Sequence, residues 1–197
     1  MSDEPATDGQ LVARILAGEA PAFNQLMTRH KSWLYLFIRR HVRSADDAYD
    51  ILQESFASAW GALKRYDQTR PFEIWLRRIA LNKCRDRGRR EAVRRRVFAF
   101  VGAPQDVEQT VADGAPGADA AHIAGEALAR LDQALAQLPA KLREPLVLTS
   151  LQGLSQRDAA QVLGVSEKAV ETRAYRARRR LAELLAPTDS ADVAAAG

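Results

Sequence analysis

Arginine side chains crowd the segment from Ser166 to Arg180, close to the carboxyl end of the chain. Arginine can donate two parallel hydrogen bonds to guanine, while threonine, tyrosine and glutamate can contact base edges or phosphates. A helix opened by Ser166, a residue type that accepts a hydrogen bond from a free backbone N–H, would project such side chains together. The residues predicted to contact duplex DNA here are Ser166, Lys168, Glu171, Thr172, Arg173, Tyr175, Arg176 and Arg179.

The local pattern around this segment is that of a helix-turn-helix. Residues 155–163 predict a short helix, Gly164 a tight turn, and residues 166–185 a second helix. The second helix has an apolar stripe with steps of four and three residues, formed by Val170, Ala174, Ala177, Leu181 and Leu184. A helix-turn-helix presents its second helix to the DNA major groove. The alternative is a solvated basic helix in an ordinary bundle.

A compact acidic stripe lies on the helical pattern from residue 45 to 65. One side of this helix is apolar, with Ala48, Leu52, Phe56, Ala59 and Leu63. The other side carries Asp46, Asp47, Asp50, Gln53 and Glu54. Such a stripe is often only a solvated face, but it would repel the phosphates of DNA. On a DNA-binding protein it is therefore a candidate site for a basic protein partner.

The positive charge of the chain is concentrated rather than spread. Residues 77–96 contain ten Lys or Arg against two acids, whereas residues 97–129 contain no Lys or Arg. Concentrated charge suits a polyanionic partner. The preceding loop, residues 61–71, combines basic groups with an aromatic ring and can hold single-stranded DNA, although Tyr66 has an alternative role in capping the core. The residues predicted to contact this strand are Lys64, Arg65, Tyr66, Arg77, Asn82, Arg85 and Asp86.

The periodicity predicts an all-α protein of two small helical domains. Further helices are expected over residues 10–18, 21–42, 124–138 and 140–152, with one from Pro71 into the basic run that could break near Gly88. Residues 101–120 are rich in Gly, Pro, acids and small residues, which predicts a flexible acidic linker. We therefore expect domains at 10–98 and 124–186, a linker at 99–123 and a tail at 187–197. The aromatic residues expected in the core are Trp33, Tyr35, Phe37, Phe72 and Trp75.

No residues are predicted to be catalytic, to ligate a metal or to bind a cofactor. Cys84 is the single cysteine, which excludes an intramolecular disulfide and predicts a buried small side chain. His30, His41 and His122 have no ligand spacing, and no phosphate-binding glycine loop or nucleophile elbow is present. No apolar run approaches the ~20 residues that cross a bilayer. Residues 1–9 lack a secretion signal, so a cytoplasmic protein without membrane insertion is expected.

Two parts of the sequence resemble bacterial sigma factors of the extracytoplasmic-function type. The stretch from Leu138 to Leu181, including Arg143-Glu144-Pro145-Leu146 and Arg176-Ala177-Arg178-Arg179-Arg180, is similar to region 4, which reads the −35 promoter element. The stretches 46–60 and 70–86 are similar to region 2, which grips the polymerase and opens the −10 element. The resemblance implies an alternative sigma factor that directs core RNA polymerase to specific promoters and initiates transcription.

The resemblance also implies partners and residue roles. Its partners would be promoter DNA, core RNA polymerase through the β′ coiled-coil and β flap, and an anti-sigma factor that holds it inactive. Asp50, Gln53 and Glu54 would contact the coiled-coil, and the loop after residue 61 would capture a base flipped from the −10 element. Tyr49 and Glu171 depart from the family pattern, since an acid and a basic residue are commoner there. Glu171 can accept a hydrogen bond from cytosine and so alter the −35 preference.

Two other classes of protein remain open from the sequence. The first is a helix-turn-helix regulator that occupies an operator without recruiting polymerase, and it gives the acidic stripe no role. The second is a nuclease, which would need a carboxylate cluster for metal ions. Only Asp46, Asp47, Asp50 and Glu54 could supply that cluster, and they have no histidine partner.

Overall fold

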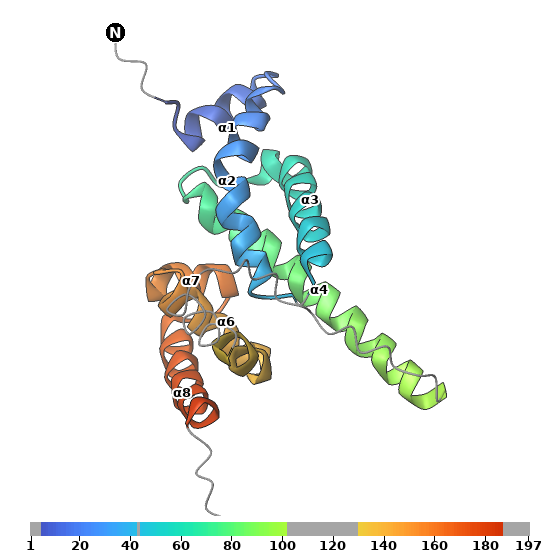
Figure 1. Cartoon of the computed structure of the whole chain (residues 1–197). Coiled ribbons are helices and arrows are strands. Elements are labelled where there is room, and N and C mark those ends of the chain that lie inside the picture. Colours follow the sequence, from blue (N-terminus) through green and yellow to red (C-terminus); the bar gives the residue numbers. More distant parts are fainter. Residues whose placement is uncertain (1–4, 43, 102–129, 187–197) are drawn as a thin grey trace, which may run out of the picture. The chain divides into compact units, whose positions relative to one another are not determined.

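A computed structural model describes residues 5–42, 44–101 and 130–186 (Figure 1). Every regular element among these residues is helical, which confirms the all-α prediction. The chain divides into two compact units, the first containing α1 to α4 and the second containing α6 and α8. Most of the expected linker and the tail lie outside the described residues, together with His122 and the acids of residues 106–119.

The first unit begins earlier than the periodicity indicated. Helix α1 spans Asp8–Leu16 and is opened by Thr7, whose side chain accepts from the Gln10 backbone N–H while the Gln10 side chain accepts from the Thr7 N–H. This reciprocal capping box satisfies two backbone donors that a helix start leaves unpaired. The helix therefore starts at Asp8 rather than at residue 10.

Three more helices complete the first unit. Helix α2 spans Ala22–Arg39, α3 spans Ala45–Ala62 with a 3₁₀ turn, η1, over Leu63–Arg65, and α4 spans Phe72–Val101. Helix α2 packs against α1, α3 and α4, and α3 packs against α4. Their apolar faces meet in a core whose fully buried side chains include Leu11, Leu26, Leu34, Phe37, Ile51, Leu76 and Leu81. Burial of this kind of surface is the dominant stabilising contribution in such a bundle.

The predicted core positions of α3 and α4 are largely confirmed. All five apolar residues of the α3 stripe are buried, as are Phe72 and Cys84. Trp33, Tyr35 and Trp75 are only half-buried. Helix α4 runs through Gly88 without a break, and its second half extends past the other helices of the unit (Figure 1). A glycine weakens a helix by only about 1 kcal/mol, and the arginines around Gly88 are good helix formers.

The second unit packs helices around a leucine-rich core. Residues 130–137 are helical, α6 spans Ala140–Leu146, and α8 spans Glu167–Leu185. Leu135, Leu138, Leu146 and Ala177 are buried together. Leu131, Leu142, Leu181 and Leu184 pack against them partly buried, so the predicted stripe of the second helix does face the core.

The expected helix over 140–152 changes its winding halfway. After α6 a π-helical turn, η2, covers Val147–Leu151, and the Gln152 backbone N–H donates to Val147 O, 3.0 Å away. Pro145 has no N–H to continue the α-helical ladder. The Thr149 hydroxyl also donates to Pro145 O at 2.8 Å. The missing N–H of Pro145 and the hydrogen bond from Thr149 both favour a wider helical turn at this point.

The helix-turn-helix is present where the sequence predicts it. Helix α7 spans Gln156–Leu163, and Gly164 follows with φ of 69°. This left-handed conformation is unfavourable for residues with a Cβ atom. The Val165 N–H closes the turn on Ala160 O at 3.1 Å, the usual bond of a glycine-terminated helix. Helix α8 then starts after Ser166.

Candidate nucleic-acid interface

The acidic residues of α3 share the side of the helix that faces away from the core. Ser44 caps α3 by accepting from the Asp47 N–H at 3.0 Å. Asp46 and Asp47 lie in the first turn, where negative charge is favourable beside the unpaired backbone N–H groups. Asp46, Asp50, Gln53 and Glu54 are exposed, and Asp47 is half-buried. The structure therefore brings the whole predicted partner-binding set onto one surface.

Three of these acids are already paired with basic side chains of α4. Arg87 Nη1 lies 2.9 Å from Asp47 Oδ1, and Arg87 Nη2 lies 3.3 Å from Asp50 Oδ2. Lys83 Nζ lies 3.4 Å from Glu54 Oε2. The two helices are antiparallel, since the later acid pairs with the earlier base. We call these contacts the α3–α4 ion pairs.

The basic residues of the loop after α3 are accessible, but the tyrosine is not. Lys64 and Arg65 are exposed on η1. Tyr66 is 9% exposed, its hydroxyl donates to Arg70 O, and its ring packs edge-on against Phe72 at a centroid distance of 5.6 Å. Burial raises the pKa of the Tyr66 hydroxyl. The core-capping role left open by the sequence is the one that Tyr66 occupies here.

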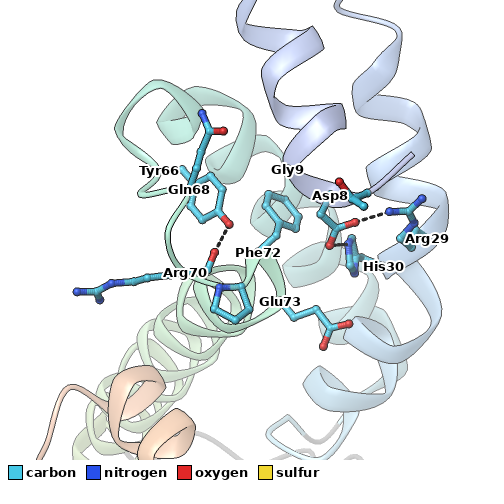
Figure 2. A pocket seen from close by; sticks show the side chains of 11 residues that line it. Asp8, Gly9, Arg29, His30, Tyr66, Gln68, Arg70, Phe72 and Glu73 are labelled. Carbon is cyan, nitrogen blue, oxygen red and sulfur yellow. Dashed lines mark hydrogen bonds and ion pairs between the residues drawn. The ribbon is translucent and has the colours of Figure 1, made fainter. Parts of the chain in front are cut away.

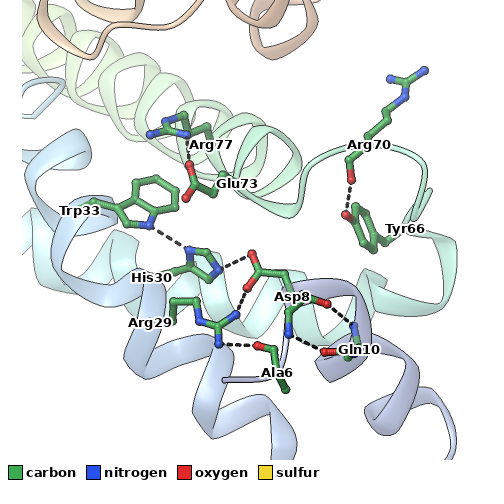
Figure 3. Close-up of polar contacts among 11 residues, drawn as sticks. Ala6, Asp8, Gln10, Arg29, His30, Trp33, Tyr66, Arg70, Glu73 and Arg77 are labelled. Atoms are coloured by element: carbon green, nitrogen blue, oxygen red, sulfur yellow. Dashed lines mark hydrogen bonds and ion pairs between the residues drawn. The ribbon is translucent and has the colours of Figure 1, made fainter. Parts of the chain in front are cut away.

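Along α4 the predicted −10 residues separate into two groups. Asn82, Arg85 and Asp86 lie together, with Arg85 Nη1 donating to Asn82 Oδ1 at 3.4 Å. Arg77 lies elsewhere around the helix. It pairs with Glu73 at 3.0 Å and stacks over the Trp33 ring, 4.2 Å from its centroid (Figure 3). Its side chain is only 11% exposed, so the structure does not place Arg77 with the other three residues.

A partly buried polar network at the start of α1 was not predicted from the sequence. The Trp33 Nε1–H donates to His30 Nδ1 at 2.9 Å, so the proton of neutral His30 lies on Nε2, 2.9 Å from Asp8 Oδ2 (Figure 3). Arg29 Nη1 donates to Asp8 Oδ1 at 2.6 Å. His30 is 1% exposed, and this burial lowers its pKa. The network fastens the start of α1 to α2.

The same network forms one wall of a cavity in the first unit. The cavity has a volume of about 490 Å³ and lies between the start of α1, α2 and the segment from Tyr66 to Glu73 (Figure 2). Its polar groups are engaged with one another: Asp8 with Arg29 and His30, and Tyr66 with Arg70. The capping-box pattern at Thr7 and Gln10 was the sequence signal that could have indicated an ordered chain here.

In the second unit the predicted DNA-contacting residues follow the outer side of α8. Ser166 caps the helix by accepting from the Ala169 N–H at 3.2 Å. Lys168 and Glu171 pair with each other at 2.7 Å, and Tyr175 is 58% exposed. Thr172 and Arg173 are half-buried, whereas Arg176 and Arg179 are exposed. The arrangement is a continuous polar surface on a helix of a size that fits a DNA major groove.

Within residues 5–42, 44–101 and 130–186, no group of three or more His, Cys, Asp or Glu side chains could hold a metal ion. Among the helices described, none has the length and apolar character needed to span a bilayer.

Comparison with known proteins accounts for both units. Residues 26–95 match the family described as Sigma-70 region 2, and residues 128–181 match Sigma-70, region 4. RNA polymerase sigma factor CnrH of Cupriavidus metallidurans is 42% identical over 94% of this chain and 97% of that protein. ECF RNA polymerase sigma factor SigM of Mycobacterium tuberculosis is 35% identical over 91% of this chain and 85% of that protein.

Solved structures agree with these relatives. CnrH in complex with the cytosolic domain of CnrY has a TM-score of 0.65 at 36% identity, covering 90% of this chain and 96% of that one. The sigma factor RpoE of Bartonella quintana, in complex with the anti-sigma factor NepR, has a TM-score of 0.66 at 25% identity, covering 84% and 97%. The fold and the two family matches thus define a transcription initiation factor of the sigma-70 class. The chain belongs to the extracytoplasmic-function sigma factors. It is an alternative sigma factor, which directs core RNA polymerase to specific promoters, rather than a regulator that only occupies an operator.

Proposed function

We propose that the first unit grips core polymerase through the outer side of α3 and reads the −10 element through α4 and the loop before it. The second unit, placed by its contact with the β flap, reads the −35 element through α8. In this scheme residues 10–98 and 124–186 are the two working domains, residues 99–123 connect them and residues 187–197 are a tail. We expect the protein to need no catalytic residue, metal or cofactor of its own and to work in the cytoplasm, where the polymerase acts.

The observation that carries the polymerase contact is the exposed acidic side of α3. Asp46, Asp50, Gln53 and Glu54 project from a helix whose other side is locked in the core. A rigid acidic surface complements a basic one and speeds its association. We assign this surface to the β′ coiled-coil, with Asp50, Gln53 and Glu54 in the centre and Asp46 and Asp47 at the margin.

The −10 contact is supported most directly by exposed polar residues. Asn82, with Arg85 and Asp86 beside it, can contact bases and backbone, and Lys64 and Arg65 can attract the displaced strand. Tyr66 and Arg77 join them only after a rearrangement. Tyr66 has to leave Phe72, and Arg77 has to leave Glu73 and Trp33.

The −35 contact is supported by the geometry of α8. Its Ser166 cap and the Gly164 turn fix where the helix starts, and its buried stripe fixes which side turns outward. Arg173 and Arg176 are our candidates for base contacts, while Arg179 and its neighbours hold phosphates. The Lys168–Glu171 pair leaves Glu171 positioned to read cytosine.

We further propose that an anti-sigma factor holds the protein inactive. Two of the solved structures similar to this chain are sigma factors in complex with CnrY and with NepR. An inhibitor of this chain would have to cover the α3 surface or the DNA-binding sides of α4 and α8. The acids Asp106, Glu108, Asp113 and Asp119 lie outside the described residues. We propose that they assist initiation by following a basic channel of the polymerase.

The test is run-off transcription from genomic promoter fragments with purified core RNA polymerase. The protein is expected to produce new transcripts, and Asp50→Arg to abolish them by reversing the charge at the centre of the α3 surface. Asp132→Arg is a matched control, because it makes the same charge change at an exposed position of the second unit. Full transcription with Asp50→Arg would contradict the α3 contact.

A further inference from the structure

The α3–α4 ion pairs join the two surfaces that the protein needs for different partners. Arg87 and Lys83 follow Asp86 and Asn82 directly in the sequence, within the part of α4 assigned to DNA. Their carboxylate partners Asp47, Asp50 and Glu54 belong to the surface assigned to polymerase. The same three contacts therefore neutralise basic groups beside the DNA site and acidic groups in the polymerase site.

The exposure of these side chains indicates which of them an incoming partner can reach first. The Asp50 and Glu54 side chains are 63% and 48% exposed, whereas Arg87 and Lys83 are 30% and 32% exposed. An incoming basic surface can thus reach the carboxylates before the ion pairs open. Between the pairs lies a cavity of about 30 Å³, lined by Ile51, Glu54, Lys83, Asp86, Arg87 and Arg90. The pairs are therefore not sealed into an apolar core that would hold them closed.

We propose that Arg87 and Lys83 are shared counter-charges that couple polymerase binding to promoter binding. In the free protein they are occupied by the acids of α3, which lowers the positive potential of α4 beside Asn82. When the basic surface of the polymerase takes those acids, Arg87 and Lys83 are released to the phosphates of DNA. This inference rests on the α3 contact proposed above.

The expected effects are moderate because the pairs are partly exposed. Exposed ion pairs change an equilibrium by at most about fivefold, and their contribution is screened by salt. Attraction of DNA phosphates depends on the number of available basic groups and is steeply salt-dependent. Both effects are therefore best measured at low ionic strength and compared by ratios between variants.

The first experiment uses the full chain without polymerase and a fluorescein-labelled oligo(dT) strand. The effect of Arg87→Gln is measured in three backgrounds. These are the natural protein, the double variant Asp47→Asn/Asp50→Asn and the single variant Asp46→Asn. Asp46 stands next to Asp47 in the same helical turn but makes no ion pair among the described residues. If Arg87 is occupied by α3, its loss weakens DNA binding little in the natural and Asp46→Asn proteins. The same loss is expected to weaken it about three- to fivefold where Asp47 and Asp50 are neutralised. An equal loss in all three backgrounds would overturn the proposal.

The second experiment measures the affinity for core RNA polymerase at low salt. Arg87→Gln is expected to bind core about three- to fivefold more tightly, since it leaves the acids of α3 without their internal competitor. Arg94→Gln is the matched control, because it removes the same charge about two turns further along the same side of α4. Circular dichroism checks that each variant folds.

The two proposals fail in different ways. If Arg87→Gln binds core no better than Arg94→Gln, the competition is wrong while the polymerase contact stands. If Asp50→Arg leaves core binding unchanged, the polymerase contact itself is wrong. The oligo(dT) experiment still decides whether Arg87 is withheld from DNA.

Discussion

The two basic helices of the protein, α4 and α8, hold their charges in different ways. On α8 the ion pairs are local, between Lys168 and Glu171 and between Arg180 and Glu183, each three residues apart. On α4, Arg77 and Arg89 also pair locally, with Glu73 and Asp86, but Arg87 and Lys83 reach across to acids of another helix. Basic side chains that pair along their own helix remain available to DNA when another partner binds elsewhere. Basic side chains that pair with another helix become available only when that helix releases them.

This difference fits the order of events that an initiation factor requires. Duplex recognition by α8 asks only for an exposed, rigid helix. Strand separation near α4 is useful only when a polymerase is present to accept the opened strand. In the proposed scheme, linking the charges of α4 to the acids of α3 makes strand opening conditional on polymerase binding, and duplex reading by α8 needs no such condition.

The largest expected effect tests the core of the first unit. Leu76 is fully buried in the first unit, so Leu76→Ala is expected to lower that unit's free energy of unfolding by about 2 to 5 kcal/mol. Trp33, Trp60 and Trp75 all belong to this unit, so tryptophan fluorescence during urea denaturation reports on it alone. The control is Leu36→Ala, at a position that is 62% exposed. Equal losses in both variants would contradict the described core.

A second, smaller effect concerns base reading by α8. We expect Arg176→Ala to weaken holoenzyme binding to a cognate −35 element by about 1 to 3 kcal/mol, and to relax the preference at one base pair. Arg180→Ala should weaken binding to every sequence alike and reduce the salt dependence, because Arg180 lies further along α8 where phosphates are expected. Anisotropy on duplexes with single −35 substitutions separates the two. Uniform weakening by Arg176→Ala would assign Arg176 to the backbone instead.

Features that depend on spacing within one helix were predictable from the sequence. The apolar stripe of α3 and the outward side of α8 follow from steps of three and four residues, and both are confirmed by burial. The turn at Gly164 followed from a residue type that tolerates positive φ. The start of α1 could also have been predicted, because Thr7 and Gln10 have the capping-box spacing, but the first helix was expected to start only at residue 10.

Features that depend on contacts between helices were not predictable. Arg87 is separated from Asp50 by 37 residues, and one ten-residue run of α4 offers several arginines. Which of them meets α3 is decided by how each helix rotates to bury its apolar side. The same holds for Asp8 and His30, which are 22 residues apart. The role of Tyr66 was not predictable either, because the residue type alone fits both packing in the core and stacking on single-stranded DNA.

The smallest effect is a pH dependence expected of the first unit. Burial lowers the pKa of His30 below its ordinary value of 6.5, so the unfolded chain binds a proton more readily than the folded one. The free energy of unfolding should therefore fall as pH drops below about 6.5, by no more than about 1.4 kcal/mol per pH unit, and level off beneath the folded-state pKa. Protonated His30 would carry hydrogen on both ring nitrogens and lose the Trp33 Nε1–H as a donor to Nδ1.

Tryptophan fluorescence during urea denaturation at a series of pH values measures this dependence in the first unit. His30→Gln is the comparison, because it cannot take up a proton in this pH range, and its unfolding should lack the step that His30 produces. A natural protein whose first unit gains stability on acidification between pH 7 and the folded-state pKa of His30 would contradict the neutral, buried histidine. In that case the start of α1 would be fastened by a charged pair between His30 and Asp8.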